Sequence, residues 1–365
     1  MVREDSEFVI VGGGLLGLAA GAALTRRGRQ VTVLEQATVG HLGGGSKGSC
    51  RIFRLGYPDP EYVALARQAR QLWTELEQPG SAQLVTPVPH LTFGSELGEV
   101  RQAMLAAGAP CELLPAGEAA RRYPGVAVPG PVLYEPGSGV IDAEAALRSL
   151  AAAVPGLRER ARVTGIGDDG RRVTVSTDGG SFSCRAVIVC AGPWTAGLLS
   201  TAKTSLPAAA TQEQVAYLAP ADGAVPGLPI VIEHGSRGFY GLPVPGAPLY
   251  KTGVHHAGPS ADPGHQDLDP DPELAQDVLD SVRRHLPGLT PHPVSLERCI
   301  YDNSPDEDFV IGRIGNVVIG SGTSGHGFKF GPLLGDWLAA LATQETAQIP
   351  RRFSPSRFTQ PGSGR

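Results

Sequence analysis

Four short runs of apolar residues along the chain predict buried strands. They contain β-branched residues, and most of their positions are apolar rather than alternating between apolar and polar. Runs of this kind are typical of the inner strands of a parallel sheet, which is covered on both faces. The pattern therefore predicts an α/β fold with strands at residues 8–11, 30–34, 186–192 and 316–322.

Apolar residues at helical spacing mark a second set of segments. In residues 60–78, for example, Tyr62, Leu65 and Ala69 recur on one face of a helix. The segment 141–154 begins with acids and is followed by a Pro–Gly pair, which is how helices start and stop. Helices are therefore expected at residues 15–27, 60–78, 141–154, 271–286 and, after a loop, in the later part of 325–341.

The remaining segments are shorter or richer in proline. Residues 83–94 alternate like a pair of strands, and residues 97–123 suggest two short helices around a strand. Residues 124–139 are expected to be loop. Residues 204–297 are dense in proline and glycine, which predicts a mostly antiparallel sheet of short strands in a second domain. The tail from residue 350 is polar and is expected to be irregular.

The first strand leads directly into the spacing G-x-G-x-x-G. Gly12 permits a tight turn, Gly14 lets a pyrophosphate approach the backbone, and Gly17 lets the helix pack against the strand. The helix N-terminus offers unpaired N–H groups to the phosphates. Glu35 ends the next strand, where it can accept hydrogen bonds from a ribose hydroxyl. A dinucleotide site is predicted, and a glycine-rich turn in an ordinary α/β protein is the alternative.

Pieces of a nucleotide-binding fold occur at the start, the middle and the end of the chain. Nicotinamide dehydrogenases more often keep this fold in one block, whereas interleaving is the habit of the FAD-binding glutathione-reductase-like Rossmann fold. By this fold-level analogy, an antiparallel-sheet substrate domain is interleaved with the cofactor domain. The cofactor domain is expected at residues 1–80, 138–203 and 298–365, and the substrate domain at residues 81–137 and 204–297.

Composition and charge narrow the class of protein. The chain has 365 residues, a formal net charge of −5 and no run rich in lysine or arginine, so nucleic acid is not an expected partner. Three consecutive glycines interrupt the apolar stretch 8–24, which follows an acidic segment. This disfavours a secretion signal and a membrane-spanning helix, and a cytoplasmic protein is expected. The five cysteines include no C-x-x-C pair, which argues against a disulfide framework and a metal site.

Two segments carry cations that could contact a ligand. Residues 47–54 hold three cations, among them Arg51 and Arg54, and arginine suits two-point contact with a carboxylate. A solvated basic loop is the alternative. On a strand, Lys251 and His255 would share a face, and a buried lysine is a functional candidate because burial shifts its pKa. An exposed lysine on an edge strand is the plainer alternative.

Three further segments offer groups to a ligand. The hydroxyl of Tyr240 would meet a ligand or lie in the core. Cys299 and Tyr301 would share a strand face, although a free cysteine is usually a small buried hydrophobe. Residues 320–332 form a glycine-rich loop before a helix, which permits close approach to a flat ring or simply close packing. Lys329 opposes the dipole of that helix, so we expect it to have another partner.

The order of these motifs resembles that of monomeric sarcosine oxidase and N-methyltryptophan oxidase. These are amine-oxidising flavoenzymes of the family that includes D-amino-acid oxidase. The resemblance covers nearly the whole chain, and it implies bound FAD and a thioether between the flavin 8α carbon and Cys299. The motifs are G-x-G-x-x-G, R-I-x-R at 51–54, Lys251 with His255, C-I-Y…P-D-E-D-F at 299–309 and S-G-H-G-F-K-F at 324–330.

The resemblance also implies a role for each candidate. Arg54 and Lys329 would clamp the substrate carboxylate and orient the α-carbon over the flavin. Arg51 would lie beside the flavin ring, and Lys251 would lie at the other flavin face, where oxygen is reduced. The residues expected to line the substrate cavity are Tyr240, His255 and Tyr301. The residues expected to contact FAD are Gly12, Gly14, Leu15, Leu16, Gly17, Glu35, Gln36, Ser46, Lys47, Arg51, Val163, Gly192, Trp194, Cys299, Gly322, Gly325, His326, Gly327, Phe328 and Lys329.

The sequence departs from the family pattern at three positions. Lys47 stands where the sarcosine-type enzymes have histidine, Cys50 where they have a small polar residue, and Asp302 where threonine is usual. These departures leave the flavin chemistry standing and leave the substrate open, including a larger, cyclic or carrier-linked one.

The function implied is an FAD-dependent oxidase of an α-amino acid or derivative that prefers a secondary amine, either N-methyl or cyclic. Hydride transfer to flavin N5 would give an imine, and reoxidation by molecular oxygen would give hydrogen peroxide. The expected partners are a small amino acid or amine carboxylate and oxygen. The alternatives are a flavin dehydrogenase, an oxidase of a primary or cyclic amino acid in specialised metabolism, a nicotinamide enzyme and a non-catalytic nucleotide-binding protein.

Overall fold

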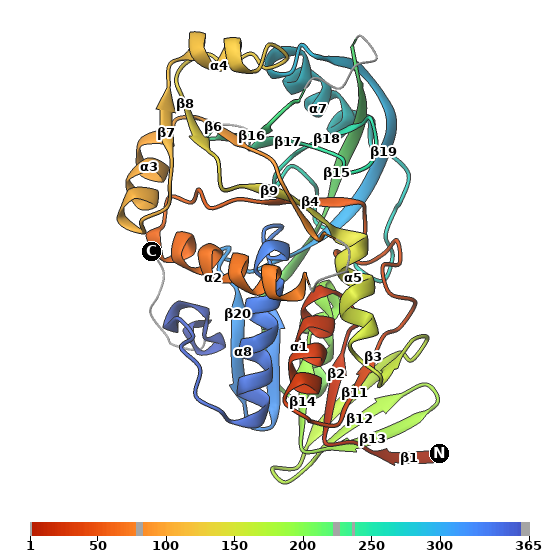
Figure 1. Cartoon of the computed structure of the whole chain (residues 1–365). Helices are drawn as coiled ribbons and strands as arrows, with labels where there is room; N and C mark the ends of the chain where they lie inside the picture. The colour runs from red at the N-terminus through yellow and green to blue at the C-terminus, as the bar shows by residue number, and fades with distance from the viewer. Residues whose placement is uncertain (1, 78–82, 222–226, 236–237, 359–365) are drawn as a thin grey trace.

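Two large sheets occupy different halves of the molecule. A computed structural model describes residues 2–77, 83–221, 227–235 and 238–358. One sheet has six strands and the other has eight. Figure 1 shows them in different halves, with α2 (Pro60–Leu76) between them. The predicted α/β class with a second, antiparallel sheet is confirmed.

The six-stranded sheet is built from the apolar runs. Its order is β10-β3-β2-β14-β21-β20, and all neighbours are parallel except β20 with β21. The four predicted strands are confirmed as β2, β3, β14 and β21, the inner four. The strands are β2 (Phe8–Val11), β3 (Val31–Leu34), β10 (Leu157–Arg158), β14 (Ala186–Val189), β20 (Val310–Ile314) and β21 (Val317–Ser321).

Both faces of this sheet are covered, which explains why its strands are apolar at nearly every position. On β2, Phe8 and Ile10 pack with the helices, whereas Val9 and Val11 pack with a four-stranded sheet. The helices are α1 (Leu15–Arg26), α5 (Ala143–Ala152) and α8 (Gly331–Thr343). The four-stranded sheet has the order β1 (Val2–Asp5), β13 (Gly180–Cys184), β12 (Val173–Thr177) and β11 (Val163–Asp168), and α6 (Thr195–Thr201) packs on β11.

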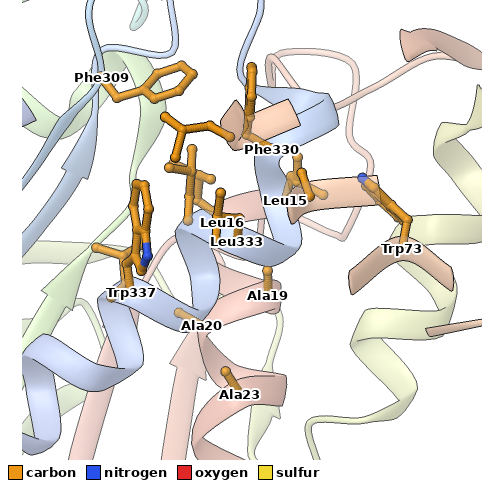
Figure 2. Close-up of a cluster of buried hydrophobic side chains, with 14 of the residues drawn as sticks. Leu15, Leu16, Ala19, Ala20, Ala23, Trp73, Phe309, Phe330, Leu333 and Trp337 are labelled. Atoms are coloured by element: carbon orange, nitrogen blue, oxygen red, sulfur yellow. The ribbon is translucent and has the colours of Figure 1, made fainter. Parts of the chain in front are cut away.

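Small residues let α1 and α8 approach closely. A Cβ at Gly335 of α8 would overlap Ala19 of α1. Figure 2 shows Ala19, Ala20 and Ala23 on α1 beside the larger Leu333 and Trp337 of α8. A Cβ at Gly331 would likewise press on Leu15. The N-terminal ends of the two helices therefore lie side by side, far apart though they are in the sequence.

The second large sheet has the order β19-β15-β18-β17-β16-β6-β8-β7. Its neighbours are antiparallel except β16 with β6, and α7 (Pro272–His285) packs on one face. The strands are β6 (His90–Gly94), β7 (Glu112–Leu114), β8 (Val132–Glu135), β15 (Ala209–Pro220), β16 (Ile230–His234), β17 (Phe239–Pro243), β18 (Tyr250–Val254) and β19 (Leu289–Asn303).

The expectation of short strands in this sheet is wrong for two of them. β15 has 12 residues and β19 has 15. Prolines suggested frequent breaks, but Pro291 and Pro293 lie on β19, an edge strand, where a missing N–H is tolerated. The predicted helix 271–286 is confirmed as α7, with Asp271 as its N-cap.

Residues 83–142 differ from expectation in three ways. The two strands predicted in 83–94 exist but do not pair, because β5 (Val85–Pro87) belongs to a three-stranded sheet and β6 to the eight-stranded one. The loop expected at 124–139 contains β8 and the start of β9 (Gly139–Asp142). The helix expected from residue 141 begins at Ala143, because Asp142 caps it by accepting the N–H of Ala145.

The three-stranded sheet has the order β4 (Cys50–Phe53), β9, β5. The two short helices around a strand predicted at 97–123 are confirmed as α3 (Leu97–Ala106), β7 and α4 (Ala116–Arg122).

The C-terminal tail is more ordered than expected. Short 3-10 helices occupy Arg351–Phe353 and Pro355–Phe358, and Phe353 is fully buried against Phe309 and Trp337. Residues 359–365 lie outside the described part.

The domain boundaries stay a prediction. The boundary expected at 80/81 also falls outside the described residues, and that at 297/298 falls within β19. None of the helices in the described ranges combines the length and the hydrophobicity that a bilayer crossing requires.

Candidate active site

One large cavity is lined by residues from both halves of the molecule. Its volume is about 1480 Å³, above the roughly 300–1,000 Å³ of ordinary small-molecule pockets. Every residue that the sequence predicts for the site lines this cavity, except Gly17 and Gly322. The roles of these residues stay predictions.

One end of the cavity is the glycine loop between β2 and α1. Gly12 has a φ of +104°, a conformation that favours glycine. Gly14, the N-cap of α1, has no side chain, and only the Ser46 hydroxyl stands close, accepting the N–H of Leu15 at 3.0 Å. The first turn of α1 carries no acid. The opening at this helix N-terminus therefore fits the pyrophosphate of a dinucleotide.

Glu35 lies beside this opening. Its carboxylate accepts the N–H of Gly13 at 2.8 Å through Oε2 and that of Ala37 at 2.8 Å through Oε1. Each carboxylate oxygen can accept a further bond. Gln36, Val163, Gly192 and Trp194 also line the cavity, as the predicted contacts to the cofactor require.

Gly17 and Gly322, the two predicted site residues that do not line the cavity, support its wall. A Cβ at Gly17 would overlap the carbonyl oxygen of Gly12, so Gly17 allows α1 to pack against the loop as predicted. Gly322 has a φ of +67°, and its N–H donates to Asp302 Oδ2 at 2.8 Å.

At the other end, Arg54 and Lys329 share a tyrosine. The Arg54 guanidinium lies 4.0 Å from the ring centroid of Tyr57, and Lys329 Nζ donates to the Tyr57 hydroxyl at 2.9 Å and to the carbonyl of His326 at 2.8 Å. These bonds supply the partners expected for a lysine placed before a helix. Burial, and next the Arg54 charge, hold the pKa of Lys329 well below its usual value. The half-buried Arg54 and the buried Lys329 would together attract an anion.

The histidines near this pair are neutral at pH 7. Burial lowers the pKa of His326 to about 3, with the Lys329 charge adding to the effect. Burial and neighbouring cationic groups also hold the pKa of His255 well below its usual value, and its Nδ1 lies 3.2 Å from the Tyr301 hydroxyl. Burial raises the pKa of Tyr240, so its hydroxyl remains a donor. These histidine and tyrosine side chains therefore offer neutral hydrogen-bonding groups, and the two histidines are weak bases.

A second group of cations surrounds the end of β4. Lys251 Nζ donates to the carbonyl of Cys50 at 3.3 Å, and Arg51 donates to the same carbonyl at 2.9 Å. Arg51 also bonds the carbonyl of Lys47 and lies 5.3 Å from the ring centroid of Phe328. Burial, and next Arg51, lower the pKa of Lys251 to about 8.

Cys299 lies at the same end of the cavity. Burial raises the pKa of its thiol, and the charges of Lys251 and Arg51 oppose that rise. On β19, Cys299 and Tyr301 are two residues apart and both line the cavity.

The three departures from the family pattern are all buried. Lys47 lines the cavity, and Cys50 is fully buried with Ser49 Oγ 3.6 Å from its sulfur. Asp302 accepts bonds from the Ser321 hydroxyl at 2.9 Å and from Gly322. Asp302 thereby joins the end of β19 to the glycine loop after β21.

Sequence reasoning missed several groups around the cations. Tyr57 follows Arg54 by three residues, which was its one signal. Glu135 lies in the segment expected to be loop, so its burial was not foreseen. His234 Nε2 lies 3.4 Å from Arg54 Nη1, and its Nδ1 lies 3.3 Å from Glu96 Oε2. Nothing in the sequence linked His234 and Glu96 to Arg54.

Comparisons with known proteins agree with this geometry. The model of the FAD dependent oxidoreductase family matches residues 7–341. The human peroxisomal sarcosine oxidase is 32% identical, covering 98% of this chain and 97% of the human protein. The N-methyl-L-tryptophan oxidase of Yersinia pestis (strain Pestoides F) is 31% identical, covering 97% of this chain and all of that protein.

A solved structure gives the same result. The structure of NikD, described as an unusual amino acid oxidase essential for nikkomycin biosynthesis, superposes with a TM-score of 0.86 at 26% identity, over 96% of this chain and 98% of NikD. The resemblance to the sarcosine and N-methyltryptophan oxidases is therefore confirmed. The chain belongs to the FAD dependent oxidoreductase family.

Proposed function

We propose that this protein is an oxidase of small α-amino acids with a secondary amine, either N-methyl or cyclic. The observation that carries the proposal is the large cavity of about 1480 Å³. It has an open helix N-terminus for a dinucleotide at one end, and at the other the half-buried Arg54 and the buried Lys329. FAD bound there would supply the two-electron acceptor for oxidation of the C–N bond.

In this proposal, Arg54 and Lys329 bind the substrate carboxylate. Two cations beside Tyr57 hold an anion in one orientation, which fixes the neighbouring carbon relative to the rest of the cavity. The rings of Tyr240, His255 and Tyr301 then exclude water and contact the amine side. Their neutral state keeps further charge away from the reacting carbon.

The substrate amine binds as its neutral form. His234, His255 and His326 lie near the clamp, and their lowered pKa values make all three weak bases. A proton must therefore leave the amine before or during binding rather than pass to a strong side-chain base. The pH dependence of substrate oxidation would then follow the pKa of the substrate amine.

Lys251 acts in the second step of the reaction, the reoxidation of the reduced flavin by oxygen. As a buried cation at the other side of the site, it stabilises the negative charge that develops as oxygen is reduced to hydrogen peroxide. Arg51, which lies against Phe328, holds a positive charge on the same side. Cys299 is proposed to carry the flavin covalently, and Lys251 and Arg51 favour its thiolate.

An anaerobic screen tests this function. The purified protein is mixed with primary, N-methyl and cyclic amino acids, each paired with its amide, and the visible flavin absorbance is followed. We expect bleaching by secondary amino acids and little by their amides, with one peroxide formed per substrate in air. Bleaching by no member of the panel would overturn the proposal.

Two other outcomes point to the alternatives. Bleaching without peroxide in air would favour a dehydrogenase. Preference for primary amino acids over both N-methyl and cyclic ones would favour an oxidase of a primary amine. We also propose a cytoplasmic location, which cell fractionation tests.

A further inference from the structure

A buried carboxylate lies directly behind the Arg54 segment. Glu135, the last residue of β8, is fully buried. Its Oε2 accepts the backbone N–H of Leu55 at 3.1 Å and that of Gly56 at 3.0 Å, the two residues after Arg54. One carboxylate oxygen therefore fixes two consecutive peptide units of the segment that carries the arginine.

Side chains also contact both carboxylate oxygens of Glu135. Ser138 Oγ donates to Oε2 at 3.2 Å, and His90 Nδ1 lies 2.8 Å from Oε1. Burial alone would raise the pKa of Glu135, but His90, Arg54 and the Gly56 N–H outweigh it and lower the pKa to about 2. The group is thus a carboxylate at neutral pH. A Cβ at Gly56 would overlap its Oε1, so only glycine permits this contact.

Arg54 is connected to this anchor through Gly56. The Arg54 Nη1 donates to the carbonyl oxygen of Gly56, whose N–H is bound to Glu135. The guanidinium then lies over the ring of Tyr57, the next residue. The orientation of Gly56 therefore determines where the guanidinium lies relative to Lys329, which bonds the Tyr57 hydroxyl.

We propose that Glu135 is a positioning residue for Arg54, which holds the guanidinium in the geometry that binds the substrate carboxylate. The inference rests on the proposed function, in which Arg54 and Lys329 form the carboxylate clamp. Glu135 acts on this clamp and not on Lys251 and Arg51, which both donate to the carbonyl of Cys50 instead.

The chain contains a matched control for substitution of Glu135. Glu77 Oε1 likewise accepts two consecutive backbone N–H groups, those of Leu84 at 2.8 Å and Val85 at 2.7 Å, but Glu77 does not line the cavity. Glu135→Gln and Glu77→Gln therefore remove the same kind of charge from the same kind of backbone contact. They differ in whether that backbone carries Arg54, and Glu77 is also less buried than Glu135.

The experiment measures binding of propionate and of its uncharged counterpart propionamide to the oxidised holoenzyme, from the change in visible flavin absorbance. In Glu135→Gln we expect the Kd of propionate to rise about tenfold, or about 1.4 kcal/mol, because small displacements of a clamp are costly. The Kd of propionamide should change by less than about twofold, and Glu77→Gln should match the parent for both.

A double variant separates this inference from the proposed function. Arg54→Met should remove most of the preference for propionate, and adding Glu135→Gln to it should have no further effect, because the two residues act as one unit. An unchanged preference for propionate over propionamide in Arg54→Met would contradict the proposed carboxylate clamp itself. Two results would overturn only the positioning role, provided that Arg54→Met loses the preference. In one, Glu135→Gln alone leaves propionate binding unchanged or makes it tighter. In the other, the loss from Glu135→Gln adds to that of Arg54→Met in the double variant.

A second variant guards against failure to fold. Glu135→Asp keeps the charge but withdraws the oxygens by one methylene group. We expect it to retain flavin and to bind propionate more weakly than the parent, with propionamide unaffected. Parent-like propionate binding in Glu135→Asp would contradict the positioning role.

Discussion

Lys251 is the residue whose charge state most directly affects the proposed reaction. It is buried, its pKa is lowered to about 8, and its partner is the Cys50 carbonyl rather than a carboxylate. We predict that Lys251→Met slows reoxidation of the reduced enzyme by oxygen by roughly 10²- to 10³-fold, the usual cost of losing a group that stabilises developing charge. Anaerobic reduction by substrate should change only a few-fold. Stopped-flow absorbance measures both steps.

The pH dependence of the same step follows from the sign of the shift. A lysine with a pKa of about 8 is a cation below that pH and neutral above it. The rate of reoxidation should therefore be constant below about pH 8 and fall above it, and Lys251→Met should lose this dependence. An equal fall in both proteins would assign the titration to another group.

Cys299 permits a direct test of covalent attachment. We predict that acid precipitation of the protein gives a yellow pellet and that Cys299→Ala gives a colourless one, because the thioether to the flavin is lost. Cys50 lines the same cavity and is fully buried, so Cys50→Ala is the matched control and should keep a yellow pellet. A yellow pellet from Cys299→Ala would locate the bond elsewhere.

At the scale of elements, α1 lies so close to the loop before it that one added methyl group would disturb the packing. A Cβ at Gly17 would overlap the backbone oxygen of Gly12, and backbone has less room to yield than a flexible side chain. We predict that Gly17→Ala lowers the free energy of unfolding by at least about 3 kcal/mol, at the upper end of overpacking effects. Denaturant unfolding measures the change.

Gly98 provides the control for this prediction. It lies in α3, and a methyl group added there would meet no atom within 4 Å, so Gly98→Ala adds helix propensity without a clash. Its free energy of unfolding should stay within about 1 kcal/mol of the parent, on the stabilising side. Equal stability of Gly17→Ala and the parent would mean that α1 can move away from the loop at little cost.

Elements differed in how far the sequence revealed them. Strands β2 and β14 were predictable because both faces are buried, which leaves a continuous apolar run. Strand β8 was not, because its four residues lie between prolines and glycines and depend on pairing with β6 and β7. Strands β1, β13 and β20 were not anticipated either. Local sequence patterns thus revealed strands that form a continuous apolar run. They missed strands that depend on pairing with strands distant in the sequence.

At the scale of the molecule, the residues that line the site were more predictable from the sequence than the residues that hold them in position. Arg54, Lys251, Cys299 and Lys329 stand in motifs that resemble a known family, so they could be singled out before the fold was seen. Glu135 could not, because its role depends on which segment the fold places against it. A buried acid is recognised only once its neighbours are known.

Residues from distant parts of the chain line one cavity, which predicts that bound FAD contributes to the stability of the whole fold. The cavity is lined by residues from Val11 to Lys329, so a ligand that fills it contacts both halves at once. A ligand that binds only the folded state at 1,000 times its Kd adds about 4.1 kcal/mol to stability. We predict that flavin-free Cys299→Ala, prepared by dialysis, unfolds at a clearly lower temperature than the same variant with FAD.

Partial ligands then locate the binding energy along the cavity. ADP fills the end at Gly12 to Glu35 and should restore part of the lost stability of flavin-free Cys299→Ala, whereas FMN lacks the adenosine part and should restore less. ADP should stabilise more than FMN because the N-terminus of α1 and Glu35 would contact the ADP part of the cofactor. The glycine loop before α8 belongs to a different part of the sequence. Stabilisation by FMN equal to that by FAD would instead place the dominant contacts at the cations around Lys251 and Lys329, and the G-x-G-x-x-G loop would then shape the fold more than it holds the cofactor.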